Sequence, residues 1–408
     1  MAKQNKPAIR FKEFTDAWEQ RKLGEVSESY SGGTPSVGVK EYYGGQIPFI
    51  RSAEINSEIT ELFLTEEGLK KSSARLVAMG DILYALYGAT SGEVGRARLR
   101  GAINQAILAI NPHTGYDSEY LAQWLRKSKH SIIETYLQGG QGNLSGTIVK
   151  ELLVDFPSLK EQRAIGDFFS QLDHLITLHQ RKYDKLQVLK KAMLEKMFPK
   201  NGSSVPEIRF KGFTDAWEQR KLGDMMNVTS VKRIHQSDWT DSGVRFLRAR
   251  DIVAAAKNEE PDDYLYISKE KYEEYSALSG KVGVSDLLVT GVGTIGVPYL
   301  VRNLEPLYFK DGNIIWFQNS DKIDGKFLFY SFSAEQIQGF INESAGIGTV
   351  GTYTIESGKK TPISLPNQIE QAKVGEFFQQ LDNLITLHQR ELEKLQNIKK
   401  SMLEKMFV

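Results

Sequence analysis

The sequence predicts an α+β protein in which two domains of mixed α/β structure are joined by two long helices. These helices are expected to pack as an antiparallel coiled coil, in a pseudo-two-fold arrangement. Three observations predict this fold: a 16-residue segment occurs twice, a 31-residue helical segment occurs twice, and the sequences between the copies are unlike. A chain of 408 residues also exceeds what one hydrophobic core ordinarily supports, so at least two domains are expected.

The two repeats have different offsets. Residues 9–24 (IRFKEFTDAWEQRKLG) and 208–223 (IRFKGFTDAWEQRKLG) agree at 15 of 16 positions, with an offset of 208 − 9 = 199. Residues 168–198 and 377–407 agree at 23 of 31 positions, with an offset of 377 − 168 = 209. The order is therefore constant, variable, constant, variable, constant. Such an order indicates one scaffold that is used twice to recognise two different things.

These repeats predict the domain boundaries. The first domain is expected at residues 1–156, with the shorter repeat at its start, and the second at residues 201–364. A central helical region is expected at residues 157–200 and a C-terminal one at residues 365–408.

The longer repeat has the alternating four-and-three apolar spacing of a coiled-coil seam. The seam residues are Phe168, Leu172, Leu175, Leu186, Leu189 and Met193, and Phe377, Leu381, Leu384, Leu395, Ile398 and Met402. His179, Lys182, His388 and Glu391 interrupt the seam, and such polar positions can define register at some cost in stability. The two histidines could instead be catalytic bases or metal ligands, but no acid, nucleophile or second ligand accompanies them in the repeat. Antiparallel packing is expected because each helix must return the chain to the next segment.

The two variable inserts resemble diverged copies of one α+β domain. Residues 49–55 and 246–252 share the pattern Phe, apolar, Arg, two residues, acid, Ile, which indicates a short strand. Period-two alternation would place Arg248 and Arg250 on one face of that strand. In each insert a second strand (residues 80–83 and 285–288) leads to a glycine-rich loop (residues 87–92 and 291–296). Glycine allows the backbone to approach either a ligand or another strand closely.

Composition excludes several classes of protein. The chain has no cysteine, which removes disulfides, Cys-ligated zinc and thiol nucleophiles. No segment approaches the roughly 20 apolar residues of a membrane span, and we expect a soluble cytoplasmic protein. The net charge of +1 provides no overall attraction to nucleic acid, so such binding would depend on local basic clusters.

Motifs for catalysis are missing from the sequence. Residues 33–40 (GTPSVGVK) resemble a phosphate-binding loop only superficially, because the lysine is displaced by one position and no Ser or Thr follows it. Residues 111–114 (NPHT) lack the aromatic fourth residue of the motif in adenine methyltransferases. Asp262 and Asp263, with Glu270 and Lys271, resemble the carboxylate set of a nuclease, but scattered acids on a loop are more typical of solvated surface charge. These features favour a binding protein over an enzyme.

Several ordered segments resemble the specificity subunit of a type I restriction-modification system. In the first insert they are residues 31–36 (SGGTPS), 43–51 (YGGQIPFIR), 80–83 (GDIL) and 103–106 (INQA). Residues 156–162 (FPSLKEQ) and 365–371 (LPNQIEQ) resemble the entry to that family's conserved helix. The second insert departs from the pattern at residues 229–233 (TSVKR) and 311–313 (DGN). Such divergence is expected if the two domains bind different sequences.

The resemblance implies a DNA-binding protein with no catalytic site of its own. Each target-recognition domain would dock in the major groove of one half of a split, asymmetric target. Phosphate contacts would position the chain, and contacts to base edges would specify the sequence. A helix of about 31 residues is about 46 Å long, slightly more than the roughly 34–36 Å of one turn of DNA. The helix pair would therefore hold the two half-sites at a fixed spacing.

Candidate DNA-binding residues lie on the predicted strands and glycine-rich loops. Arg51, Arg248 and Arg250 are the main candidates, because an Arg can pair bidentately with guanine. The alternative is that they form surface or intradomain ion pairs. The other candidates are Thr34, Gly88, Thr90, Gln141 and Asn143 in the first domain, and Lys232, Arg233, Gly293, Thr294 and Thr349 in the second.

The nearly identical repeats predict that one partner protein docks twice. The resemblance implies two copies of a methyltransferase subunit, joined by ATP-driven restriction subunits. S-adenosylmethionine, ATP and Mg²⁺ would be bound by those subunits, with no cofactor or metal on this chain. Candidate docking residues are Trp18, Gln20, Arg21, Trp217, Gln219 and Arg220, although both tryptophans could be core residues. The alternative function is a tandem-domain structural or small-ligand-binding coiled-coil protein, which leaves the divergence of the inserts unexplained.

Overall fold

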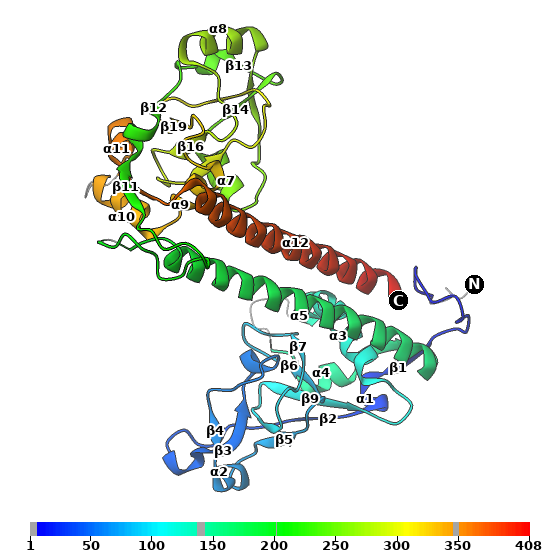
Figure 1. Cartoon of the computed structure of the whole chain (residues 1–408). Coiled ribbons are helices and arrows are strands. Elements are labelled where there is room, and N and C mark those ends of the chain that lie inside the picture. Colours follow the sequence, from blue (N-terminus) through cyan, green and yellow to red (C-terminus); the bar gives the residue numbers. More distant parts are fainter. Residues whose placement is uncertain (1–5, 137–142, 201, 346–350) are drawn as a thin grey trace. The chain divides into compact units, whose positions relative to one another are not determined.

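The computed structural model describes residues 6–136, 143–200, 202–345 and 351–408. The chain divides into two compact units: unit 1 comprises residues 1–178 and 391–408, and unit 2 comprises residues 179–390. The division crosses both long helices, α5 (Leu159–Lys196) and α12 (Gln368–Met406), which are labelled in Figure 1. The boundaries predicted at residues 156 and 364 lie just before these helices begin.

Within the described residues of unit 1, the strands form two four-stranded sheets and one two-stranded pair. One sheet has the antiparallel order β2-β9-β6-β7, and the other has the order β4-β3-β8-β5, in which β3 and β8 are parallel. β1 pairs with β10 beside the start of α5. The strands are β1 (Glu19–Lys22), β2 (Ser27–Ser31), β3 (Tyr43–Ile50), β4 (Phe63–Leu64), β5 (Arg75–Val77), β6 (Ile82–Ala85), β7 (Val94–Arg96), β8 (Gly101–Ile103), β9 (Ile107–Pro112) and β10 (Leu153–Phe156). The shorter helices are α1 (Leu23–Val26), α2 (Glu66–Lys70), α3 (Ser118–Tyr136) and α4 (Gly146–Lys150).

Unit 2 has a similar plan, but its second sheet differs: β18 is a terminal strand, whereas its counterpart β8 in unit 1 is flanked by β5. The described strands of unit 2 form sheets of order β12-β19-β16-β17 and β13-β15-β14-β18, and β11 pairs with β20. The strands are β11 (Glu218–Lys221), β12 (Asn227–Thr229), β13 (Trp239–Thr240), β14 (Val244–Leu247), β15 (Leu265–Ile267), β16 (Leu287–Thr290), β17 (Pro298–Leu300), β18 (Leu307–Phe309), β19 (Ile314–Gln318) and β20 (Pro362–Leu365). The helices are α6 (Leu222–Met225), α7 (Ala249–Ala256), α8 (Lys269–Ser279), α9 (Gly325–Ser331), α10 (Glu335–Ser344) and α11 (Ile355–Lys360). The prediction of two diverged α+β copies is confirmed.

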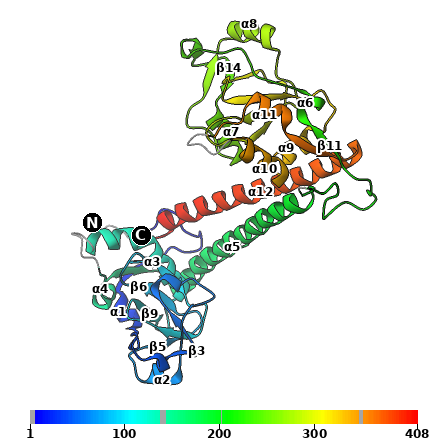
Figure 2. The ribbon, with the colours of Figure 1, turned by 90° about the vertical axis from the view of Figure 1, so that its left-hand side faces the viewer.

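The long helices lie side by side and antiparallel (Figure 2). Contacts between them fall in opposite chain order: Asp173 meets Lys399, His179 meets His388, and Lys190 meets Asp382. The predicted helices and their antiparallel packing are therefore confirmed. α5 has 38 residues, about 57 Å at 1.5 Å per residue.

Part of the predicted seam is wrong. Leu172 is buried, but Leu175 is 40% exposed, Leu189 39% and Leu384 44%. Each helix packs against a domain core as well as against the other helix, which turns these leucines outward. Phe169, which was not assigned to the seam, is fully buried instead, as is its repeat counterpart Phe378.

The end of each long helix completes a domain core. Phe407, next to the C-terminus, lies in the core of unit 1 and stacks on Phe169 with ring centroids 5.8 Å apart. Phe198, its repeat counterpart at the end of α5, lies in the core of unit 2 and stacks on Phe378 at 5.9 Å. Unit 1 is thus closed by residues from both ends of the chain.

A buried ion pair fastens each copy of the shorter repeat to a long helix. Arg10 donates two hydrogen bonds of 2.7 Å to Glu161, and Arg209 donates bonds of 2.6 and 2.7 Å to Glu370. The side chains of the two glutamates are 1% and 0% exposed. The two repeats therefore form one frame that is built twice.

Candidate nucleic-acid interface

Several predicted residues of unit 1 gather where the parallel strands β3 and β8 end. Ile50 of β3 lies opposite Ile103 of β8. Arg51 and Asn104 follow these residues, so they leave the sheet at the same edge. We name the loops that meet here edge 1: residues 32–34, 51, 86–92, 104–106 and 143–144.

Backbone hydrogen bonds hold the loops of edge 1 together. The N–H of Leu86 donates to the carbonyl of Ala106 at 2.8 Å, and the N–H of Leu144 donates to the carbonyl of Leu86 at 2.8 Å. The predicted residue Asn143 is exposed and adjoins this contact. Gln141, also predicted, lies outside the described residues.

The loop that carries Thr34 packs directly on β8. A Cβ on Gly32 would stand 1.8 Å from the carbonyl oxygen of Ile103, so only glycine fits there. The Thr34 hydroxyl donates a 2.6 Å hydrogen bond to Oε1 of Gln105, and both side chains are exposed. The structure thus pairs Thr34 with a residue that sequence analysis did not select.

The predicted glycine-rich loops contain two glycines with positive φ in each unit. Gly88 and Gly92 have φ values of +85° and +77°, and Gly293 and Gly296 have values of +71° and +76°. A Cβ on Gly88 or Gly293 would meet nothing within 4 Å, so the left-handed backbone explains the glycine there. Both glycines are exposed at the tips of their loops. The prediction of a turn, a strand and a glycine-rich loop is confirmed.

Arg51 is held by two carboxylates. Its guanidinium donates to Glu54 at 2.9 and 3.2 Å and to Glu61 at 2.6 Å. Burial alone would raise the pKa of Glu54, but hydrogen bonds from the Arg51 side chain and from the backbone N–H groups of Arg51 and Glu61 lower it to about 2. The side chain of Arg51 is 38% exposed. The structure therefore shows the ion pairs that the sequence left as an alternative for this residue.

Edge 2 is the equivalent place in unit 2: residues 229–233, 248, 291–296, 310–313 and 351–353. Leu247 lies opposite Phe309 on parallel strands. The same backbone bonds recur, from Gly291 N–H to the carbonyl of Asn313 and from Tyr353 N–H to the carbonyl of Gly291, each 2.8 Å. The two edges therefore share these two backbone hydrogen bonds.

The side chains at edge 2 are different. The guanidinium of Arg233 donates a 2.8 Å hydrogen bond to Asp311 and remains 67% exposed. This charged pair joins the loops that Thr34 and Gln105 join at edge 1. Lys232 is exposed, and its ammonium lies 6.0 Å from the ring centroid of Tyr275.

The predicted placement of Arg248 and Arg250 on one strand face is wrong. The strand β14 ends at Leu247, Arg248 is the N-cap of α7, and Arg250 lies within that helix. The reason is a capping box, in which the Arg248 N–H donates to Asp251 at 2.8 Å. Arg248 also contacts Asp263 at 2.8 Å, and Arg250 contacts the same carboxylate while 60% exposed.

Thr90, Thr294 and Thr349 complete the predicted set. Thr90 is half-buried in the loop after β6, and Thr294 is exposed in the loop after β16. The Thr294 carbonyl accepts a 2.5 Å hydrogen bond from the Thr290 hydroxyl. Thr349 lies outside the described residues.

Comparison with known proteins decides the family. Residues 15–188 and 214–397 each match the type I restriction modification DNA specificity domain. The chain belongs to this specificity family. It is a type I restriction-modification specificity subunit with two recognition domains, one in each unit.

Relatives and a solved structure agree with this assignment. The chain is 24% identical over 405 residues to the type I restriction enzyme MjaVIII specificity subunit of Methanocaldococcus jannaschii, covering 95% of this chain and 91% of the relative. It is 28% identical over 261 residues to the MjaIX specificity subunit of the same organism, covering 60% of each. The S subunit from M. genitalium has the same fold, with a TM-score of 0.68 at 15% identity over 99% of both chains.

The predicted docking residues of the specificity subunit are of two kinds. Trp18 and Trp217 are 7% and 3% exposed. They are core residues, which is the alternative that the sequence analysis gave for them. Gln20, Arg21, Gln219 and Arg220 lie on the exposed strands β1 and β11. Arg21 and Arg220 pair with the glutamates two residues before them, at 2.7 and 2.5 Å.

Exposed leucines on the long helices are further surface residues that sequence analysis missed. Leu175 and Leu178 are 40% and 38% exposed on α5, and their repeat counterparts Leu384 and Leu387 are 44% and 51% exposed on α12. The coiled-coil pattern assigned two of the four to a buried seam. The sequence did contain one signal for these surface leucines, because each of them is repeated at the offset of 209.

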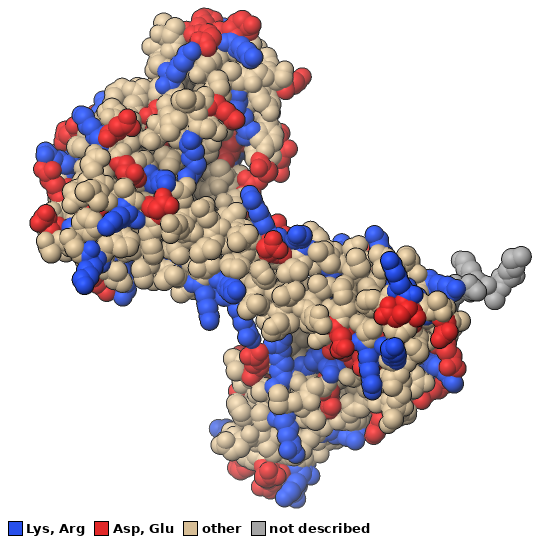
Figure 3. All heavy atoms as spheres, turned by 45° about the vertical axis from the view of Figure 1, so that its right-hand side comes forward, with Lys and Arg blue, Asp and Glu red and all other residues tan. Residues whose placement is uncertain are grey.

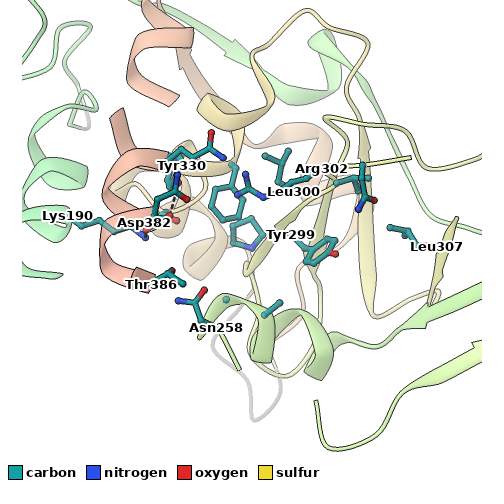
Figure 4. Close-up of a pocket in the computed structure, with 18 residues that line it drawn as sticks. Lys190, Asn258, Tyr299, Leu300, Arg302, Leu307, Tyr330, Asp382 and Thr386 are labelled. Atoms are coloured by element: carbon teal, nitrogen blue, oxygen red, sulfur yellow. Dashed lines mark hydrogen bonds and ion pairs between the residues drawn. The ribbon is translucent and has the colours of Figure 1, made fainter. Parts of the chain in front are cut away.

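Each unit has a cleft between its recognition domain and the long helices. In unit 2 a cleft of about 590 Å³ is lined by β17, α9 and α12 (Figure 4). Asp382 there accepts hydrogen bonds from Tyr330 and from Lys190, each 2.6 Å long. Burial and the Asp382 carboxylate raise the pKa of Tyr330. Arg302 also lines the cleft, with its guanidinium 5.7 Å from the ring centroid of Phe329.

The cleft of unit 1 is also lined by the long helices, but its other lining residues are different. Its volume is about 450 Å³, and Asp173 and Lys399 occupy the places of Asp382 and Lys190. These other residues include Arg96, Arg98 and Arg126 instead of Arg302. The repeated helices α5 and α12 thus border clefts that differ in their other lining residues. The two edges differ from each other in the same way, because equivalent positions carry different side chains.

Charged side chains of both signs are mixed on the face of the molecule that Figure 3 shows, where Lys and Arg are interspersed with Asp and Glu. In the part of the chain that the structure describes, no group of three or more His, Asp or Glu side chains is arranged to hold a metal ion. None of the helices there has the length and apolar content that a membrane span requires.

Proposed function

We propose that this specificity subunit recognises a split, asymmetric DNA target, with one recognition domain for each half-site. It directs adenine methylation or ATP-dependent cleavage, which partner subunits carry out. One observation carries the proposal: edges 1 and 2 are joined by the same two backbone hydrogen bonds but present different side chains at matching places. A repeated backbone with changed side chains is suited to binding one kind of polymer at two different sequences.

The chemistry of the two edges supports different base contacts. Thr34 and Gln105 offer a neutral hydroxyl and an amide, and Gln can pair with adenine in the major groove. Arg233 offers a guanidinium, which pairs with guanine, and Asp311 can accept from cytosine. We therefore assign a neutral polar contact to the first half-site and a charged contact to the second.

The arginines differ in how freely they can reach DNA. Arg233 and Arg250 have exposed side chains, 67% and 60%, with one carboxylate each. Arg248 is 15% exposed and bound to two carboxylates, so its role in this proposal is to hold the start of α7. Arg51 must leave Glu61 to contact a base, while Glu54 keeps it oriented. Lys232, Gly88, Gly293, Thr90, Thr294, Asn143, Gln141 and Thr349 remain proposed contacts to DNA.

The proposed partners are two copies of a methyltransferase subunit together with restriction subunits. The repeated leucine pairs, Leu175 with Leu178 and Leu384 with Leu387, offer the same exposed apolar surface twice. Exposed apolar patches of this kind mark protein interfaces, and a duplicated patch suits two copies of one partner. Gln20, Arg21, Gln219 and Arg220 extend these proposed docking surfaces.

Catalysis and cofactors are proposed to belong to the partners. This chain has no cysteine and no sequence motif for phosphate or S-adenosylmethionine binding. We therefore assign S-adenosylmethionine, ATP and Mg²⁺ to the methyltransferase and restriction subunits. Because the proposed target is cellular or invading DNA, the proposed place of action is the cytoplasm.

Alanine substitution at each edge in turn tests the proposal. The chain is coexpressed with its methyltransferase partner, and methylated sites are mapped across a plasmid library. Thr34→Ala with Gln105→Ala should relax one half-site and leave the other unchanged, and Arg233→Ala with Asp311→Ala should do the reverse. The proposal fails if both pairs alter the same half-site, or if neither alters site choice while methylation continues.

A further inference from the structure

Two histidines face each other across the long helices. His179 on α5 and His388 on α12 occupy the same place in the repeat, since 388 − 179 = 209. Their Nδ1 atoms are 3.1 Å apart, and their rings are inclined by 65° with centroids 5.1 Å apart. Both side chains are half-buried. The proposed recognition of DNA uses neither residue.

A 3.1 Å separation requires that at most one of the two Nδ1 atoms carries the contact proton. In the neutral pair one imidazole donates Nδ1–H, and the other accepts with its Nδ1 lone pair. Burial lowers the pKa of His388, and the nearby His179 and Lys182 lower it further. Neutral imidazole is the state that binds metals.

The same separation matches the bite of one metal ion. Zn²⁺ binds imidazole nitrogen at about 2.0–2.1 Å. Two nitrogens 3.1 Å apart at that bond length subtend an angle of about 98° at the ion, between the square and the tetrahedral values. Binding requires the donating imidazole to move its proton from Nδ1 to Nε2, so no proton is released.

We propose that His179 and His388 form a binding site for a divalent transition-metal ion of the Zn²⁺, Ni²⁺ and Cu²⁺ class. The ion takes the place of the shared proton and joins α5 to α12 through one residue of each helix. Since the structure places no third His, Asp or Glu ligand there among its described residues, water completes the coordination. The ammonium of Lys182 opposes cations near the pair, so ions with strong affinity for imidazole are selected over Mg²⁺ and Ca²⁺.

Titration of the full-length chain with Zn²⁺ and with Cu²⁺ tests this site. Calorimetry at pH 7.5 should give one ion for each chain, and the spectrum of the Cu²⁺ form in electron paramagnetic resonance should show two imidazole nitrogens. His179→Ala and His388→Ala should each weaken binding by about 10² or more, because the second ligand acts at high effective concentration. His174→Ala is the matched control, because the repeat places Asn383 at its counterpart and no such pair forms. It should bind like the parent chain.

Folding must be separated from metal binding in these variants. His388→Asn keeps a polar side chain at the seam, and circular dichroism without metal shows whether each variant keeps its helices. Loss of the tight site in a folded His388→Asn chain supports the proposal. Equal binding by the parent, His179→Ala and folded His388→Asn chains, or no binding by the parent chain at 100-fold excess of Zn²⁺, overturns it. Neither result depends on DNA binding.

Discussion

Phe407, the residue before the C-terminus, should stabilise unit 1 although most of that unit lies at the other end of the chain. Its side chain is 3% exposed and packs on Tyr120 and Phe169, with ring centroids 5.2 and 5.8 Å away. Phe407→Ala removes the ring and leaves a cavity between these partners. Truncation of a buried Phe costs about 3–5 kcal/mol, a factor of roughly 10²–10⁴ in the folding equilibrium.

Hydrogen exchange measured by mass spectrometry assigns this loss to a unit. Phe407→Ala should reduce the protection of α3 in unit 1 and leave α9 in unit 2 near its original value. The matched variant Phe198→Ala should do the opposite, because Phe198 packs on Phe327 and Phe378 in unit 2. If Phe407→Ala changes α3 by less than about 1 kcal/mol, or weakens α9 as much as α3, the C-terminus does not close unit 1.

Three further predictions concern the frame, the first edge and the helices. Glu161→Gln and Glu370→Gln each leave a buried arginine without its charged partner, so each should lower the free energy of unfolding, measured with urea, by about 3 kcal/mol. A loss below about 1 kcal/mol would show that the ion pair is replaceable. The carboxylate of Glu54, whose pKa is lowered to about 2 from 4.5, favours the folded state when ionised, so its contribution is present above pH 4.5 and is lost as the pH falls towards 2. Urea unfolding at pH 7 and pH 3 should therefore show a smaller loss of stability in Glu54→Gln than in the parent chain, and equal losses would contradict the assigned role of Arg51. Insertion of seven residues after Gln187, together with seven after Ile385, lengthens the helix pair by about 10.5 Å. The gap between the two half-sites in the DNA should therefore grow by about three base pairs at 3.4 Å each. Altered half-sites at the original gap would exclude the helices as the spacer.

The repeats allowed most of the frame to be predicted from the sequence. Nearly identical segments must fold alike, and the helices at Leu159–Lys196 and Gln368–Met406 begin close to the predicted boundaries. Apolar spacing shows that a helix has a buried face, but not what covers that face. Leu175 and Leu384 were therefore assigned to a seam, whereas Phe169 and Phe378 bury the helices against the domains.

The candidate site was predicted less completely, because its contacts are not local. Thr34 was selected for its loop, but its partner Gln105 is 71 residues away and no local pattern connects them. Arg248 was placed on a strand because the predicted strand pattern was extended beyond Leu247, where β14 ends. Its interaction with Asp251 ends the strand and starts α7, although Arg is not a usual N-cap residue.

The most direct test of the central claim is selection of DNA from a random-sequence library. The specificity subunit is purified in complex with the proposed methyltransferase subunit, and the retained DNA is sequenced. Two short, unlike motifs at one fixed separation are predicted, one for each edge. A single motif, two identical motifs, or retention without any motif would contradict the proposal that one frame, built twice, binds two different half-sites.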